Sequence, residues 1–260
     1  MAKEHPILET RDLTIRFGGH VAVDHVSCAF DRGTLTAIVG PNGAGKTTYF
    51  NLISGQLTAT SGKVLLNGEV ITRMSVPERT GRGIGRAFQL TNLFPTLSVR
   101  ENVRLVVQAK ARKGFDLFSV AESHVELLER ADHVLAEVKL IDKAHQTVSA
   151  LPHGDQRKLE VALMIALGAQ VMMFDEPTAG MSVDEVPVIL ELIKKLKADL
   201  DRTILLVEHK MDVIRTLADR IIVLHNGALV ADGDPAEVIA LPIVQEAYLG
   251  KAPEKAGEAA

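Results

Sequence analysis

Residues 40–48 read GPNGAGKTT, and their types and spacing suit the binding of a phosphate group. They match the pattern G-x-x-x-x-G-K-[ST], after the apolar run LTAIVG and before the helical stretch GKTTYFNLIS. Such a loop turns successive backbone N–H groups toward a β-phosphate, and the helix start adds its positive dipole end. We therefore predict a nucleotide site made by these loop residues: Gly40, Pro41, Asn42, Gly43, Ala44, Gly45, Lys46, Thr47 and Thr48.

Two acidic residues after an apolar strand could supply the metal and base chemistry of this site. VMMFDE ends in Asp175 and Glu176, and α/β folds place ligands at the carboxyl ends of strands. Such an ending is weak alone, because many strands end in a solvated acid, but beside a phosphate loop it becomes specific. We predict that Asp175, through water, and Thr47 bind Mg²⁺, and that Glu176 polarises the attacking water.

Two further side chains are expected to reach the phosphates. Lys46 is predicted to bind the β- and γ-phosphate oxygens. His209 ends the apolar run TILLVEH, where a neutral imidazole could hydrogen-bond the γ-phosphate or the attacking water. A single histidine at a strand end is more often structural, so the functional interpretation of His209 depends on the other motifs.

Apolar patterning indicates the elements that must position these residues. Strands are predicted at 26–30, at 35–40 and at 63–71, the last with an Asn-Gly pair suited to a type I′ turn. From about residue 96 the period becomes helical, beginning with a capping box of Ser98 and Glu101. Strands and a helix alternate again after residue 170. The pattern predicts an α/β fold in which a helical block interrupts a sheet-based core.

Composition limits the classes of function. The chain has 260 residues, 47% of them hydrophobic, which suits one large α/β domain or a domain with an attached lobe. The net charge of -4 gives no reason to expect binding of nucleic acid. A single cysteine and the absence of a signal-peptide pattern favour the cytoplasm. The most apolar stretch, 161–174, is shorter than a membrane span, so a membrane role is expected to need a partner.

Together these motifs resemble the ATP-binding cassette of ABC transporters, over residues 7–250. The resemblance implies a P-loop NTPase fold, the α/β ABC nucleotide-binding domain with a β-rich N-terminal subdomain and an inserted helical lobe. It implies that 1–92 and 166–260 form the RecA-like ATP-binding core with the antiparallel β subdomain. The lobe at 93–165 is then expected to carry the signature motif.

The resemblance also implies roles that no local pattern marks. Phe17 corresponds to the aromatic that stacks on adenine, and Gln89 to the glutamine that links the lobes and touches Mg²⁺. Taken alone, the first could be a core aromatic and the second a loop amide. Glu176 and His209 correspond to the catalytic glutamate and the switch histidine, and Gln89 joins them as a catalytic residue.

The stretch LPHGDQ corresponds to the signature, which completes the ATP site of the opposite subunit in a dimer. Its assigned residues are Leu151, Pro152, His153, Gly154 and Asp155. Pro152 stands where a serine is usual and offers neither a hydroxyl nor an N–H. We expect the free N–H groups of His153 and Gly154, and the dipole of a helix over 153–167, to face the phosphate instead. A working surface is thus favoured over a dead one.

Four longer stretches, FGGHVAVDHVS, GRAFQLTNLFPTLSVRENV, EPTAGMS and VQEAYLG, resemble the importer ATPases for branched-chain amino acids. In EPTAGMS, Ser182 stands where the wider family often has an aspartate that makes a contact across the dimer. The resemblance implies an ATP-hydrolysing, energy-coupling subunit with ATP and Mg²⁺ as cofactors. It also implies two membrane permease subunits, a second ATPase or a second copy in a head-to-tail dimer, and, indirectly, an extracytoplasmic solute-binding protein. The expected location is peripheral, on the cytoplasmic face of the membrane.

Other functions remain open from the residues. Similar importers serve urea, short amides and aromatic acids, and an ATPase that does not touch the solute cannot distinguish them. A soluble ABC ATPase for assembly or repair is a second reading, although no coiled coil or zinc module is evident. A third is a module that uses ATP only to hold a dimer together, which Glu176 and His209 disfavour.

Overall fold

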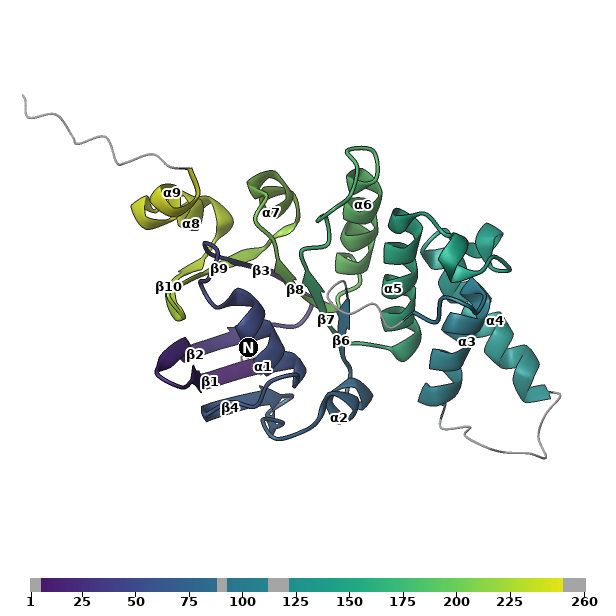
Figure 1. Cartoon of the computed structure of the whole chain (residues 1–260), viewed down its shortest axis with the longest axis horizontal. Coiled ribbons are helices and arrows are strands. Elements are labelled where there is room, and N and C mark those ends of the chain that lie inside the picture. The colour runs from purple at the N-terminus through teal and green to yellow at the C-terminus, as the bar shows by residue number, and fades with distance from the viewer. Residues whose placement is uncertain (1–5, 88–92, 112–121, 250–260) are drawn as a thin grey trace, which may run out of the picture. The chain divides into compact units, whose positions relative to one another are not determined.

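The computed structural model describes residues 6–87, 93–111 and 122–249. The chain divides into two compact units, Met1–Met74 with Thr203–Ala260, and Ser75–Arg202. The second unit contains the whole helical block 93–165 and extends beyond it on both sides. Assignment of 93–165 as a separate lobe stays a prediction. Figure 1 labels the helices and strands of both units.

The first unit contains an antiparallel sheet with the strand order β2-β1-β4-β5. Its strands are β1 (Leu8–Phe17), β2 (His20–Phe30), β4 (Ser61–Leu66) and β5 (Glu69–Val70). Asn67 and Gly68 join β4 to β5 with positive φ angles of 51° and 81°. The predicted type I′ hairpin is therefore confirmed.

The first unit also contains a run of strands in the order β10-β9-β3-β8. They are β3 (Leu35–Val39), β8 (Thr203–Val207), β9 (Arg220–His225) and β10 (Ala228–Gly233). β3 is parallel to both of its neighbours and buried at all five positions, which explains its unbroken apolar sequence. Ile38 is paired with Val207, so the carboxyl ends of β3 and β8 lie at one edge. The helices of this unit are α1 (Lys46–Ser54), α7 (Met211–Leu217), α8 (Pro235–Ala240) and α9 (Pro242–Leu249).

The second unit combines two parallel strands with most of the longer helices. β6 (Ile84–Ala87) pairs with β7 (Val171–Asp175). The helices are α2 (Val76–Gly81), α3 (Val99–Lys110), α4 (Glu122–Glu137), α5 (His153–Leu167) and α6 (Val186–Lys197), with short 3-10 turns η1 (Ile141–Lys143) and η2 (Val148–Ala150). α5 has the bounds that the sequence predicts, and it ends at Gly168 in a left-handed conformation.

Helices α3, α4 and α5 pack against one another through buried apolar side chains (Figure 1). Arg100 on α3 and Asp132 on α4 add two hydrogen bonds of 2.7 Å. The hydroxyl of Ser98 accepts the N–H of Glu101, as predicted, but the Glu101 carboxylate binds Arg104 instead. Only the Ser98 half of the predicted capping box therefore forms. Among the described residues, no helix has both the length and the apolar character needed to cross a membrane.

Candidate functional site

The phosphate loop predicted at 40–48 joins β3 to α1. Gly45 precedes the first helical residue with a φ of 96°. A side chain at this position would place its Cβ 2.4 Å from the carbonyl oxygen of Ala22, so only glycine fits. The helix ends at Gly55, which is also in a left-handed conformation. The local geometry is that of a strand, a tight loop and a helix whose N-terminus is available to an anion.

The side chain of Lys46 is held against this loop. Its ammonium donates to the carbonyl oxygens of Gly40 and Pro41, at 2.6 and 3.0 Å. Pro41 also accepts the N–H of Ala44 at 3.1 Å. Thr47 is exposed, so its hydroxyl is accessible to a metal ion. These residues fit a polyphosphate chain with a bound cation, because they combine an ammonium, a hydroxyl and a helix start on one turn.

His209 lies two residues after the end of β8, at the same edge as the phosphate loop, because β3 and β8 are parallel. Its side chain is 53% exposed, and Nδ1 lies 3.5 Å from Oε1 of Glu208. Glu208 is fully buried and accepts the N–H groups of His209 and Lys210, at 2.9 and 3.1 Å. The sequence reasoning missed Glu208, which fixes the backbone on which the histidine is presented. The catalytic role of His209 stays a prediction.

Phe17 ends β1 and is 50% exposed. The alternative interpretation of this residue as a core aromatic is therefore wrong. An exposed aromatic face at the end of a strand is available for stacking on a base. Contact with adenine stays a prediction.

Asp175 is the last residue of β7, in the second unit, and it forms a buried ion pair that the sequence did not predict. The guanidinium of Arg86, on β6, donates to Oδ2 of Asp175 at 2.7 Å, and the side chains are only 8% and 6% exposed. Burial lowers the pKa of Arg86, and the nearby Asp175 carboxylate opposes that shift. The sequence feature that could have indicated this ion pair is the arginine within the apolar stretch IGRA. Gln89, three residues later, lies outside the described residues.

Glu176 follows directly, half-buried, with a positive φ of 51°. A left-handed conformation at a residue other than glycine costs about 1–2 kcal/mol. Its carbonyl oxygen accepts the N–H of Ala179 at 3.0 Å, which closes a tight turn after the strand. Strained backbone of this kind is concentrated at functional sites, consistent with the predicted role as the base.

The predicted signature surrounds the start of α5. Leu151 is buried, His153 is exposed, and Pro152 is the residue before the helix rather than part of its first turn. The N–H of Gly154 donates to Oε1 of Glu185 at 3.2 Å. The prediction of a free N–H at Gly154 is therefore wrong in this structure, because a carboxylate of the same chain already binds the positive end of the helix.

Glu185 also binds the loop that follows β7. Its Oε2 accepts the N–H and the hydroxyl of Ser182, at 3.0 and 3.1 Å. The pKa of Glu185 is lowered, first by the N–H of Ser182, then by its hydroxyl and by the N–H of Gly154. This residue was missed because the sequence gives no sign of a contact 31 positions away.

Asp155 is buried and is held by two lysines of the same unit. Lys158 donates to Oδ1 at 2.7 Å, and Lys143 donates to Oδ2. Burial favours a raised pKa for Asp155, but the two lysine hydrogen bonds outweigh it, and the pKa is lowered. Its contacts with Lys143 and Lys158 tie η1 to α5, and a direct contact of Asp155 with nucleotide stays a prediction.

Within the first unit, the structure brings the phosphate loop and His209 to one sheet edge. Within the second, Asp175 ends β7 and Glu176 follows it, and Glu185 joins the start of α5 to the loop around Ser182. The roles of these residues in catalysis and metal binding remain predictions.

Comparison with known proteins gives matches over nearly the whole chain. A family model described as ABC transporter matches residues 23–179. The high-affinity branched-chain amino acid transport ATP-binding protein BraF of Pseudomonas aeruginosa is 36% identical over 252 residues, 95% of this chain and 99% of that protein. LivG of Escherichia coli K12, with the same description, is 35% identical over 254 residues, 95% and 99% of the two chains.

Solved structures give the same result for the fold. The ADP conformation of MJ1267, an ATP-binding cassette of an ABC transporter, has a TM-score of 0.80 at 28% identity, covering 94% of this chain and 99% of that one. A dimeric, post-hydrolysis structure of the cassette MJ0796 with ADP and Pi has a TM-score of 0.73 at 27% identity, covering 88% and 98%.

Proposed function

Because the chain belongs to the ABC transporter family of ATP-binding proteins, we propose that it energises the import of branched-chain amino acids. It is an ABC ATPase, and its fold is that of a P-loop ABC nucleotide-binding domain. The observation that carries the proposal is the similarity to BraF and LivG along 99% of their length, because it extends beyond the phosphate loop that all such ATPases share.

In this proposal the first unit binds the nucleotide. Lys46 neutralises negative charge on the β- and γ-phosphates, and the loop N–H groups and the positive end of the α1 dipole also bind the phosphates. Phe17 stacks on the base. Thr47 and Asp175 are the residues that would hold Mg²⁺, with Gln89 as a third. When bound, the metal ion supplies positive charge to the phosphate oxygens.

Hydrolysis is assigned to residues at the ends of two strands. Glu176 accepts a proton from the attacking water, and His209 orients the water or the γ-phosphate by a hydrogen bond. Glu208 and the turn at Glu176 would hold the two side chains in place. The loss of a general base in such a site slows a reaction by about 10²- to 10⁴-fold.

The proposed assembly is a head-to-tail dimer of this chain with a second copy or with a related ATPase, on two membrane permeases. An extracytoplasmic protein would deliver the solute, and the dimer would lie on the cytoplasmic face of the membrane. The dimeric cassette MJ0796 supports dimerisation by likeness. In the dimer, the start of α5 would complete the opposite subunit's ATP site.

Two alternatives to this proposal remain. The first changes the transported solute, and the second has no transport function. An importer of the same type for urea, amides or aromatic acids would share every motif of the ATPase. A soluble ABC ATPase would hydrolyse ATP without a permease. The match to branched-chain amino acid transport proteins along nearly their whole length favours import.

The direct test is uptake into proteoliposomes that contain the chain with its permease partners and its solute-binding protein. We expect ATP-dependent uptake of leucine that greatly exceeds uptake of urea or benzoate. Lys46→Ala is the matched control, because it should abolish uptake without preventing assembly. Uptake of urea without uptake of leucine would contradict the proposed solute. Failure of the chain to bind any permease would favour the soluble ABC ATPase.

A further inference from the structure

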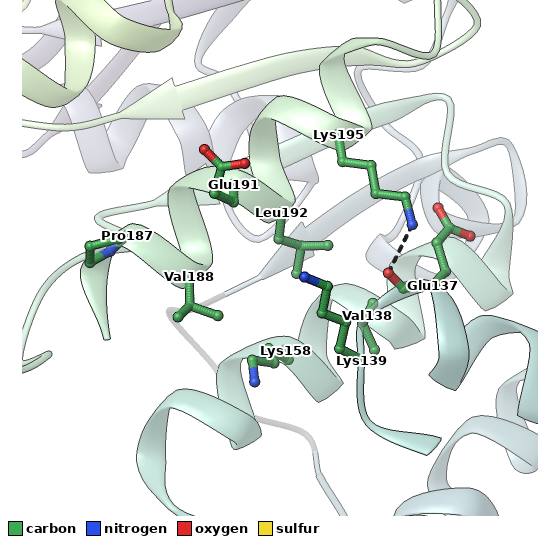
Figure 2. A pocket seen from close by; sticks show the side chains of 9 residues that line it. All are labelled: Glu137, Val138, Lys139, Lys158, Pro187, Val188, Glu191, Leu192 and Lys195. Carbon is green, nitrogen blue, oxygen red and sulfur yellow. Dashed lines mark hydrogen bonds between the residues drawn. The ribbon is translucent and has the colours of Figure 1, made fainter. Parts of the chain in front are cut away.

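A pocket of about 450 Å³ lies in the second unit (Figure 2). It is bordered by the end of α4, by α5 and by α6. Val138, Val188 and Leu192 give it apolar walls, and Lys139, Lys158 and Lys195 add ammonium groups. A volume of this size can take a small organic molecule, and the mixture of surfaces suits one that is part apolar and part charged.

The two acidic residues of the pocket are already paired with cations that do not line it. The carboxylate of Glu137 accepts a hydrogen bond from Arg202 at 3.1 Å. Glu191 lies 3.5 Å from the ammonium of Lys194. The negative charges of the pocket are thus largely compensated from outside.

The lysines are compensated to a smaller extent. Lys158 is paired with Asp155 at 2.7 Å. Lys195 donates to the backbone carbonyl oxygen of Glu137 at 3.1 Å, drawn as the dashed line in Figure 2, and this contact cancels no charge. Lys139 has no ion pair with any of the described residues. The pocket therefore carries an excess of positive charge from Lys139 and Lys195.

The backbone at Lys139 gives an independent reason to assign its side chain a role. Lys139 follows α4 with a positive φ of 58°. Its N–H bonds the carbonyl of Ala136, and the N–H of Leu140 bonds that of Leu135, at 3.1 and 2.8 Å. This helix ending favours glycine, so the lysine stands against the local preference of the backbone. In Figure 2 its side chain extends from the end of α4 toward Leu192 of α6.

We propose that this pocket binds a small aliphatic carboxylate. The carboxylate would be bound by Lys139 and Lys195, and the aliphatic part would pack on Val138, Val188 and Leu192. Lys158 lies on α5, so a bound molecule would contact the helix that begins at the predicted signature. The proposal concerns only the second unit and does not depend on the transported solute or on ATP hydrolysis.

The test is calorimetric titration of the full-length chain with octanoate below its micelle-forming concentration. We expect one octanoate per chain in the wild type. Lys139→Gly should weaken binding by about tenfold or more, the effect of losing one charge-assisted hydrogen bond. Because glycine suits the backbone at this position, the thermal unfolding temperature of the variant should be unchanged or higher. This measurement separates a loss of binding from a loss of folding.

Two further variants and one further ligand complete the test. Lys195→Ala should weaken octanoate binding in the same way, whereas Lys197→Ala, on the same helix but outside the pocket, should not. Octylamine, with the same chain and the opposite charge, should not bind. The proposal is overturned if the wild type binds no octanoate, if both pocket variants bind it as the wild type does, or if octylamine binds equally well.

Discussion

The carboxylate of Glu185 accepts a hydrogen bond from the backbone N–H of Gly154, with 3.2 Å between Oε1 and the nitrogen. The same carboxylate binds the N–H and the hydroxyl of Ser182. One side chain thus joins the start of α5 to the loop after β7. If α5 carries the signature, Glu185 occupies an N–H that the phosphate of a partner's ATP would otherwise reach.

We expect Glu185→Gln to favour the ATP-bound dimer, because the amide keeps the shape but removes a negative charge from the helix start. The ATP concentration at half-maximal dimer formation should fall about two- to fivefold, the usual effect of one charge at a helix terminus. Light scattering during an ATP titration measures this. Asp184→Asn, at the exposed neighbouring acid, is the control and should have little effect. A higher ATP requirement in Glu185→Gln would mean that Glu185 supports the assembled site instead.

Pro152→Ser should change the ATPase rate of the assembled transporter by less than about tenfold. The proline precedes α5 without a side-chain cap, and a serine could cap the helix while restoring the usual hydroxyl. Gly154→Asp should abolish activity, because a Cβ there would lie 2.8 Å from the Glu185 carboxylate and the new charge would repel it. Steady-state phosphate release measures both. Adding Glu185→Ala to Gly154→Asp removes both the close contact and the charge repulsion within the chain, and a still inactive double variant would locate the defect at the partner's phosphate. Normal activity of Gly154→Asp would show that this surface is not catalytic.

Arg86→Met should lower the free energy of unfolding by about 3–5 kcal/mol, because it leaves the Asp175 carboxylate buried without its partner. Urea denaturation followed by circular dichroism measures the loss. Arg11→Met is the matched control: Arg11 binds Glu9 at the same distance of 2.7 Å, but on the exposed surface, so its loss should matter little. Equal effects of the two variants would contradict the structural role given to the Arg86 pair.

Phe94→Asp should uncouple ATP hydrolysis from transport. Phe94 is 54% exposed, and its backbone is held by Asn102, which accepts its N–H at 2.8 Å and donates to its carbonyl oxygen at 3.1 Å. A fixed, exposed aromatic is suited to seating an apolar helix of a membrane partner. Uptake and permease co-purification should be measured together. Normal uptake with the permease bound would contradict this interpretation.

The sequence predicted the parts of the fold that depend on local chemistry. The apolar strand before the phosphate loop, the Asn67–Gly68 turn and the bounds of α5 all follow from short-range patterns. The Asn226–Gly227 turn into β10 carries the same signal, with φ angles of 47° and 80°, but the hairpin was not predicted from it.

Long-range polar contacts could not be predicted in this way. Arg86 with Asp175 joins positions 89 residues apart, and Glu185 with Gly154 joins positions 31 apart. Neither pair has a spacing that a helix or a hairpin would bring together, so the partners are defined only by the tertiary fold. Phe17 shows the same limit, since its exposure depends on what packs around the end of β1.

The central claim, that this chain hydrolyses ATP with Glu176 as the base, is tested most directly by phosphate release from Glu176→Gln. Removing the base should lower turnover by about 10²-fold or more while ATP affinity is kept. The slowed variant should also accumulate as an ATP-bound dimer in size-exclusion chromatography. Turnover near that of the wild type would contradict the assignment of Glu176 and the mechanism built on it.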